Sequence, residues 1–315
     1  MSDLVVVEPG LLTIVQDLGR PGWQRLGIPP SGPLDRGAFV VANRLVGNPD
    51  AAAGLELTLR GPRLEVRREC LVAVTGADMG FAVNGQPAPA WTAVRLRPDD
   101  VVAFRMATAG CRAYLAVAGG LDLPPALGSR STYLRGRLGG VDGRPLQKGD
   151  GLPIGPVAGG FERLEGRTVP EARRPEYPGE IECRVILGPQ DDRFTHAGIA
   201  AFLGAPYEVT PQADRMGYRL KGPHITHARG HDIISDGIPL GGIQVTGEEQ
   251  PIVLLVDRQT TGGYTKIATV IRVDIARIGQ TRPGHRVRFR RATLDEAHAA
   301  LRQERAWLDA AVQPH

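Results

Sequence analysis

Short apolar or alternating runs recur along the chain, and most of them end at a glycine or proline turn. Runs of this length and pattern predict β-strands rather than helices. The clearest are residues 64–66, 71–74, 94–96, 101–104, 114–117, 184–187, 252–256 and 268–273. The 315 residues include 41 glycines and 26 prolines, which suits many tight turns. The pattern therefore predicts a mainly-β chain, arranged as a sandwich or a barrel.

Three segments show a helical spacing of apolar residues instead. Residues 33–46 stop at Gly47, and residues 192–203 stop at Gly204. The third segment runs from residue 293 to about residue 312. It opens with Thr-Leu-Asp-Glu, a capping box in which the Thr and Glu side chains bond each other's backbone amides. We expect this last helix to pack on a barrel or on a partner.

Three short patterns occur twice in the same order, which indicates duplication of one β domain. They are PLDR at 33–36 and QADR at 212–215, LRGPRL at 59–64 and LKGPHI at 220–225, and RPDDVVAF at 97–104 and RPGHRVRF at 282–289. Pro, Gly, Arg and Glu gather without periodicity at residues 155–178. We therefore predict a first domain at 1–155, a linker at 156–178, and a second domain with a C-terminal helix at 179–315.

A polar segment, residues 257–266, directly follows the apolar run at 252–256. A strand that is apolar at every position is buried on both faces, so its end holds the following residues in one place. The segment ends in Lys266, one of only three lysines among 38 basic residues. An ammonium can lose its proton, which a guanidinium does not do. Function is expected in this segment.

The dipeptide Asp-Arg occurs here and at both copies of the first repeat. A guanidinium offers a planar fork of donors to a carboxylate, phosphate or oxyanion, while the acid can orient it or can simply hold a turn. Together with the lysine, these pairs are the predicted catalytic residues: Asp35, Arg36, Asp214, Arg215, Asp257, Arg258 and Lys266. The predicted substrate-binding residues are Gln212, Gln259, Thr260 and Asn43, although Asn43 lies among apolar neighbours and also fits a purely structural role.

Other sites are disfavoured by spacing. His224, His227, His231 and Asp232 resemble a metal set, but residues three apart in a strand face opposite ways and Gly230 interrupts a helical spacing. No metal is therefore expected. The net charge is +4, acids are interspersed among the bases, and residues 286–291 alternate like a strand with one solvated face. Nucleic acid is thus not an expected partner.

The sequence also bears on compartment and cofactors. Its three cysteines lie far apart, like core residues in a reducing compartment, and no leader or bilayer-spanning run is evident. A cytoplasmic location is therefore expected. The sequence lacks a phosphate loop, a GxSxG elbow and a biotin-attachment lysine. A nucleotide or biotinyl group is expected to arrive bound to another protein, with no cofactor held covalently.

Five segments in the same order resemble the allophanate hydrolase subunit 2, or biotin-dependent carboxyltransferase, family. They are GIPPSGPLDR at 27–36 with ANRLVGN at 42–48, GSRST at 128–132, PQADRMGY at 211–218, IISDG at 233–237, and residues 250–266. The resemblance implies two tandem cyclophilin-like β-barrels. It also implies a hydrolase subunit, inactive alone, that works with A and B subunits of an ATP-dependent 5-oxoprolinase to open 5-oxo-L-proline to L-glutamate.

The resemblance leaves two other functions open. One is transfer of a carboxyl group from carboxybiotin to urea, and the other is regulation by binding a kinase-inhibitor-like B subunit. For ring opening, the site would need cations for phosphate or carboxylate and donors for the developing oxyanion. The expected cations are Arg36, Arg215, Arg258 and Lys266. Gln212, Gln259 and Thr260 would position substrate, and Asp35, Asp214 or Asp257 would orient an arginine or activate water.

Overall fold

The computed structural model describes residues 2–157 and 159–312. The chain divides into two compact units, called here the first and the second unit. The first contains Met1–Arg20, Ser31–Glu176 and Ala306–His315, and the second contains Pro21–Pro30 and Tyr177–Arg305. In sequence, Pro21–Pro30 of the second unit interrupt the first unit, and the first unit resumes at Ala306 after the second has ended.

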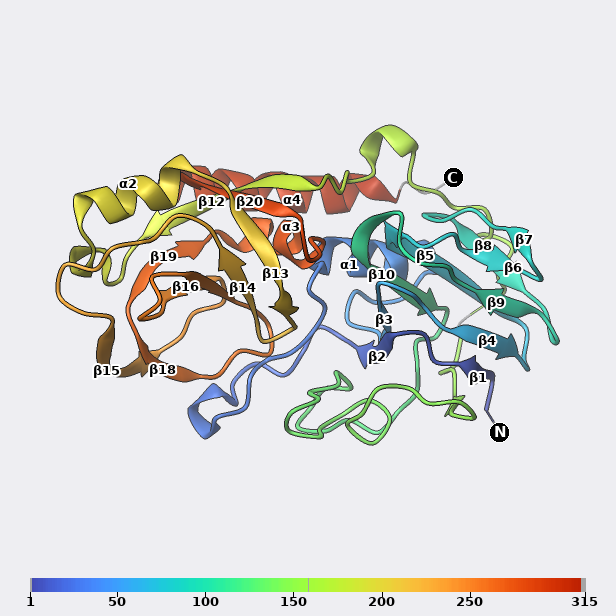
Figure 1. Cartoon of the computed structure of the whole chain (residues 1–315). Coiled ribbons are helices and arrows are strands. Elements are labelled where there is room, and N and C mark those ends of the chain that lie inside the picture. The colour runs from blue at the N-terminus through green and yellow to red at the C-terminus, as the bar shows by residue number, and fades with distance from the viewer. Residues whose placement is uncertain (1, 158, 313–315) are drawn as a thin grey trace. The chain divides into compact units, whose positions relative to one another are not determined.

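The first unit is built from two sheets (Figure 1). The six-stranded sheet has the order β11 (Gly151–Leu152), β1 (Leu4–Glu8), β4 (Arg63–Val66), β9 (Val101–Ala103), β6 (Ala82–Val83) and β7 (Gln86–Pro87). The five-stranded sheet has the order β2 (Leu12–Gln16), β3 (Gly54–Thr58), β10 (Ala109–Val117), β5 (Cys70–Asp78) and β8 (Ala93–Leu96). One cluster of buried side chains draws on strands of both sheets, so their inner faces pack together.

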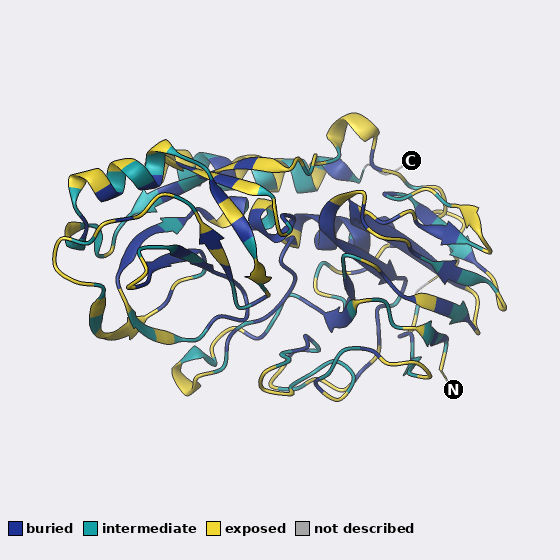
Figure 2. Cartoon of the chain, in the orientation of Figure 1, coloured by how far each residue is buried: buried dark blue, intermediate teal, exposed yellow. Residues whose placement is uncertain are grey.

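Helix α1 (Arg36–Leu45) packs on the outer face of the five-stranded sheet, against β5 and β10. Its apolar stripe includes Phe39 and Val41, which join a second buried cluster with Tyr114 of β10. β5 and β10 are thus covered on both faces, and Figure 2 shows them buried along most of their length. Continuous burial explains why these strands read as apolar at nearly every position.

The second unit contains a closed barrel, which confirms the mainly-β prediction and the predicted barrel. Its order is β12 (Glu180–Leu187), β19 (Lys266–Val270), β16 (Gly242–Val245), β17 (Pro251–Leu254), β14 (Gly217–Lys221), β13 (Tyr207–Ala213) and β20 (Arg286–Arg291). Parallel pairing of β12 with β20 completes the ring. In β20, Val287 and Phe289 are buried while the alternating arginines face outward, so the predicted solvated strand face is confirmed.

Shorter elements complete the second unit. β15 (Asp232–Gly237) pairs with β18 (Thr261–Tyr264) in a separate two-stranded sheet, drawn at the lower left of Figure 1. The helices are α2 (His196–Gly204), α3 (Ile275–Gly279) and the 3-10 turns η1 (Gln24–Leu26), η3 (Asp191–Arg193) and η4 (Arg272–Asp274). Phe202 of α2 stacks on Phe289 of β20 with ring centroids 4.7 Å apart, which fixes α2 on the barrel.

The last helix, α4 (Leu294–Ala311), begins with the predicted capping box. The Glu296 amide donates to the Thr293 hydroxyl (3.2 Å), and the Thr293 amide donates to the Glu296 carboxylate (2.7 Å). Residues up to Arg305 belong to the second unit, and residues from Ala306 belong to the first. None of the helices among the described residues combines the length and apolar character needed to cross a bilayer.

Two sequence-based expectations differ from the structure. The segment expected as a linker joins the first unit, where Val169 is fully buried and η2 (Glu171–Arg173) follows it. Its residues 166–169 hydrogen-bond to Trp91 and to Ala93 at the start of edge strand β8, so a loop without periodicity still packs. The strand expected at 268–273 ends at Val270 because the apolar run continues into η4. The first unit's strands are arranged in two sheets, and the closed barrel belongs to the second unit.

Candidate functional site

The Lys266 side chain is fully buried, although Lys266 was expected at the end of a polar loop. It is instead the first residue of barrel strand β19. Its ammonium donates to Asp236 of β15, with Nζ and Oδ2 3.3 Å apart. The Asp236 side chain is 54% exposed, so the cation lies inside the unit and its counter-charge lies at the surface. The Gly237 amide, and then the lysine, hold the pKa of the Asp236 carboxyl below its usual value.

Gln190 ties the two charged residues together. Its Oε1 accepts from the Lys266 backbone amide (3.0 Å), and its Nε2 donates to Asp236 Oδ2 (3.4 Å). Its own amide donates to the Lys266 carbonyl (3.1 Å). The side chain therefore holds the start of β19 and the carboxylate of β15 in one arrangement.

Two glutamine amides face each other next to this lysine. Gln244 of β16 is the cross-strand partner of Lys266, and partners of this kind project on the same face of a sheet. Gln259 Nε2 donates to Gln244 Oε1 at 3.4 Å. Gln244 Nε2 and Gln259 Oε1 are buried and have no hydrogen-bond partner among the described residues. The structure thus brings Gln259, a predicted substrate-binding residue, close to the predicted lysine.

Arg258, which precedes Gln259 in the chain, is buried, and its guanidinium bonds only backbone oxygens among the described residues. Nε donates to the Ile238 carbonyl (2.9 Å), and Nη1 donates to the Leu255 carbonyl (3.2 Å). Burial lowers the pKa of Arg258 to about 10. The group is therefore still protonated at neutral pH, and its charge is not neutralised by a carboxylate in the described part of the chain.

Arg215 and Asp257 form an ion pair in which both side chains are less than a tenth exposed. Arg215 Nε donates to Asp257 Oδ2 at 2.8 Å, and Nη2 donates to Oδ1 at 3.3 Å. The Asp257 amide also donates to the Arg215 carbonyl (3.0 Å). Two of the predicted catalytic residues thus satisfy each other, and they join the β13–β14 turn to the end of β17.

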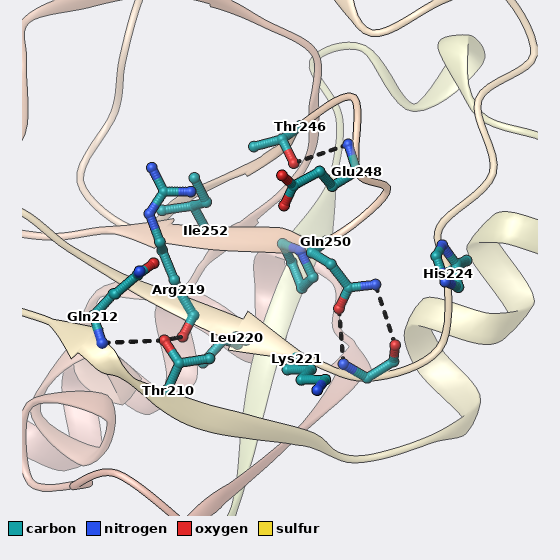
Figure 3. A pocket seen from close by; sticks show the side chains of 12 residues that line it. Thr210, Gln212, Arg219, Leu220, Lys221, His224, Thr246, Glu248, Gln250 and Ile252 are labelled. Carbon is teal, nitrogen blue, oxygen red and sulfur yellow. Dashed lines mark hydrogen bonds between the residues drawn. The ribbon is translucent and has the colours of Figure 1, made fainter.

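Asp214 and Gln212 are both exposed, on the β13 side of the same unit. Asp214 Oδ1 accepts from the amides of Met216 and Gly217, which is the bonding of a turn residue. Gln212 lines a surface pocket of about 350 Å³ (Figure 3). The Gln212 backbone amide there donates to the Thr210 hydroxyl.

The pocket in Figure 3 does not include Lys266, Arg258 or Gln259 among its lining residues. Its charged side chains are Arg219 and Lys221 with Glu248, which is a mixed and exposed set. Thr260, the remaining candidate of the polar segment, contributes its backbone carbonyl to the Ile238 amide (3.0 Å). The polar segment and the pocket are therefore separate features of the second unit.

The other three predicted residues belong to the first unit. Asp35 caps α1 by accepting from the Ala38 amide (3.0 Å), and Arg36 is exposed at the start of that helix. Asn43 is fully buried and donates to the Ala52 carbonyl (3.0 Å), while its Oδ1 accepts from Asn48 (2.9 Å). Asn43 thus has the cross-linking role that its apolar neighbours suggested.

A buried polar network beneath α1 has no counterpart among the residues predicted from the sequence. Glu56 of β3 accepts from the Leu34 amide and the Tyr114 hydroxyl, both at 3.0 Å, and lies 3.7 Å from Arg112 Nε. The Tyr114 hydroxyl in turn accepts from the Asp35 amide (2.7 Å). Burial raises the pKa of Tyr114 well above its ordinary value. The sequence signal that could have revealed this network is Glu56, a charged residue inside the otherwise apolar strand β3.

The GSRST segment has a structural partner that the sequence did not reveal. Asp17 is buried and accepts from the hydroxyls of Ser129 (2.5 Å) and Ser131 (2.7 Å) and from the Arg130 amide (2.5 Å). This carboxylate organises the loop that follows β10. The motif therefore anchors a long loop of the first unit.

The histidines of the second unit are dispersed. The His227 and His231 rings lie 6.1 Å apart, and the His224 side chain is 73% exposed. Among the described residues, no group of three or more His, Cys, Asp or Glu could hold a metal ion. His227 Nε2 instead lies 3.1 Å from the Thr265 hydroxyl.

Sequence comparison places these features in a known context. The chain is 36% identical to the 5-oxoprolinase C subunit of Escherichia coli (strain K12), over 97% of this chain and 96% of that protein. It is 33% identical to urea amidolyase of Lachancea kluyveri, over 98% of this chain but only 18% of that protein. The first relative thus matches from end to end, whereas the chain spans about a fifth of the second.

The structural comparison and the family match agree with the sequence comparison. The crystal structure of K. lactis urea amidolyase superimposes with a TM-score of 0.92 at 31% identity, over 98% of this chain and 20% of that one. The family described as "Carboxyltransferase domain, subdomain A and B" matches residues 26–291. The chain therefore belongs to the carboxyltransferase-domain family, of which it contains subdomains A and B.

Proposed function

We propose that this chain is the C subunit of an ATP-dependent 5-oxoprolinase, a hydrolase component that acts with A and B subunits. The assembly would open 5-oxo-L-proline to L-glutamate. The observation that carries this proposal is the end-to-end match, at 36% identity, to a 5-oxoprolinase C subunit of nearly the same length. A second protein of that name, from Haemophilus influenzae, matches at 33% identity over 94% of this chain and 93% of that protein.

The chemistry of the reaction fits the buried charges of the second unit. A lactam is a resonance-stabilised amide, so water attacks it only after its carbonyl oxygen has been activated, for which ATP supplies the energy. The activated species and the tetrahedral intermediate both carry negative charge. Fixed cations in a site without water stabilise such charge more strongly than solvent does. Lys266 and Arg258 are buried cations of this kind.

The contacts suggest a division of roles among the candidates. Within the described residues Arg258 bonds backbone carbonyls only, so its charge can meet a carboxylate or a phosphate of the substrate. Lys266 is held by Asp236 and could move its proton to a leaving nitrogen or neutralise an oxyanion. Arg215 and Asp257 satisfy each other, and we assign them to positioning the loop that carries Arg258.

The deciding experiment is glutamate release from 5-oxo-L-proline in the presence of ATP. It should be run with this chain alone and then with its cognate A and B subunits. We expect glutamate only from the complete set, since the chain has no phosphate-binding loop of its own. A complete set that hydrolyses ATP but releases no glutamate would overturn the proposal.

Carboxyl transfer to urea is the second candidate, and the structural comparison favours it. The TM-score of 0.92 was obtained with a urea amidolyase, in which this fold is about a fifth of the chain. Urea, like a lactam, is a planar amide. A carboxylated biotin carrier supplied with urea and this chain would yield a carboxylated urea if this candidate is correct, and none if the oxoprolinase proposal holds.

A further inference from the structure

We propose that Gln244 and Gln259 form an amide-reading pair that selects substrates presenting a carbonyl oxygen and an N–H on one edge, as lactams and ureas do. This inference deepens the proposed function and rests on it for the identity of the natural substrate. Gln244 was not among the residues predicted from the sequence.

The two side-chain amides satisfy each other only in part. One bond joins the two side chains, from Gln259 Nε2 to Gln244 Oε1. That bond leaves the Gln244 amide nitrogen and the Gln259 amide oxygen buried and without partners among the described residues. Leaving a buried polar group unsatisfied is costly, so such groups in folded proteins generally have a partner.

The demand for one donor and one acceptor does not depend on how the amides are oriented. Turning both amides round preserves the bond between them and exchanges the two unsatisfied atoms. Turning only one would place two like atoms in contact. In either allowed arrangement the pair offers one N–H and one oxygen, which an amide with cis geometry satisfies with its own oxygen and N–H.

The backbone of β18 approaches the pair closely at this point. Gly262 of β18 lies against the pair, and a Cβ on it would approach Gln244 Nε2 to 2.8 Å and Ile238 Cδ1 to 2.7 Å. Its backbone does not require a positive φ, so the glycine is needed for space rather than for conformation. Any other residue would collide with the unsatisfied Gln244 nitrogen and displace that side chain.

The pair is also joined to the charged residues. Gln244 is the cross-strand partner of Lys266, and Gly262 is the cross-strand partner of Asp236. An amide bound by the two glutamines would therefore lie near the ammonium proposed to act on it. The glutamines that bind the amide and the lysine that acts on it would then lie at the same end of the barrel.

Direct binding to the full chain tests the inference without relying on turnover. The probes are 2-pyrrolidone, which has both the oxygen and the N–H, and N-methyl-2-pyrrolidone, which lacks the N–H. We expect ligand-observed NMR to give an affinity for 2-pyrrolidone about tenfold or more above that for the methylated compound. Equal affinities, or no binding of either compound to the wild type, would overturn the inference.

Substitutions test whether 2-pyrrolidone binds at the two glutamines. Gln259→Leu, at a partly exposed position, and Gln244→Leu are each expected to weaken 2-pyrrolidone binding by about tenfold. Gly262→Ala is expected to do the same through lost space, which keeps the test valid if Gln244→Leu does not fold. Gln303→Leu, on the exposed face of α4, is the matched control and should bind like the wild type.

The assembled enzyme separates this inference from the proposed function. If the complete set releases glutamate, Gln259→Leu should raise KM for 5-oxo-L-proline about tenfold with a smaller change in kcat, because the lost bond acts in substrate binding. Unchanged KM and kcat would overturn the amide pair and leave the oxoprolinase function standing. Selective 2-pyrrolidone binding without any glutamate release would overturn the function and leave the pair standing.

Discussion

Lys266 and Arg215 are both buried cations of the second unit, but their counter-charges differ in exposure. Asp236, the partner of Lys266, is 54% exposed, whereas the Asp257 partner of Arg215 is 7% exposed. Removing a buried cation is expensive when it leaves a buried carboxylate uncompensated, and much less so when the carboxylate can turn to water. The two residues should therefore behave differently on substitution.

Lys266→Met is expected to reduce activity strongly with little loss of stability. Methionine fills a similar volume, and Asp236 remains solvated after the change. Steady-state kinetics of the assembled enzyme should show kcat reduced by about 100-fold or more, as for loss of a group that stabilises transition-state charge. Lys221→Met, at an exposed lysine of β14, is the control. Activity within about twofold of wild type would remove Lys266 from the site.

Arg215→Met is expected to destabilise the protein by about 3–5 kcal/mol, because it strands the Asp257 carboxylate in the interior. Asp257→Leu should be similarly costly. The double substitution should be less destabilising than the sum of the two, and urea denaturation of the four proteins gives the coupling energy. Additive single effects would show that the two side chains do not depend on each other.

Stability is expected to rise with pH below about 6.5 partly through His227. Burial lowers the pKa of His227 from its ordinary 6.5, so the unfolded chain binds the proton more tightly than the folded one. This contribution is fully present above pH 6.5 and is lost as the pH falls through the lower, folded-state pKa. His227→Gln should show a smaller difference in unfolding free energy between pH 5 and pH 7 than wild type. An identical difference would contradict this assignment.

At the scale of elements, local signals determined what the sequence could predict. The three helices were located within a few residues because caps and terminal glycines are encoded locally. Strand pairing is not local. That Gln244 lies beside Lys266 follows from β16 pairing with β19, which no periodicity reveals. The sequence therefore predicted the segment 257–266, but it did not predict the residues that contact this segment, which are Asp236, Gln190 and Gln244.

The capping box gives a prediction at the same scale. Thr293→Ala removes the hydroxyl that accepts from the Glu296 amide, and should cost about 1 kcal/mol of stability. Thr293→Ser keeps the hydroxyl and should cost much less. Chemical denaturation of both variants provides the comparison. Equal losses would mean that the methyl group, and not the cap, matters at this position.

At the scale of the molecule, the repeat in the sequence and the two units of the structure do not share boundaries. The first unit extends to Glu176 and resumes at Ala306, and the second takes Pro21–Pro30 from within the first. The change in amino-acid composition at residues 155–178 shows where the strand pattern stops. It does not show which hydrophobic core the segment packs against. Trp307, Leu308 and Ala311 of α4 complete the buried cluster around α1.

Deleting the chain from Leu294 onward should therefore loosen the first unit. Hydrogen–deuterium exchange is expected to speed up in peptides covering Arg36–Leu45, since α1 loses the apolar side chains that cover it. Trp307→Ala should produce a weaker effect in the same peptides. Unchanged protection of α1 after the deletion would mean that α4 contributes nothing to that core.

The exchange of segments between the units has a consequence for synthesis. Domains usually fold in the order in which the ribosome makes them. Here the first unit lacks Ala306–His315 until almost all of the second has been translated, while the second needs Pro21–Pro30, which were made near the start. Neither unit can thus be encoded by one uninterrupted gene fragment, and the first can be completed only after most of the second has been translated.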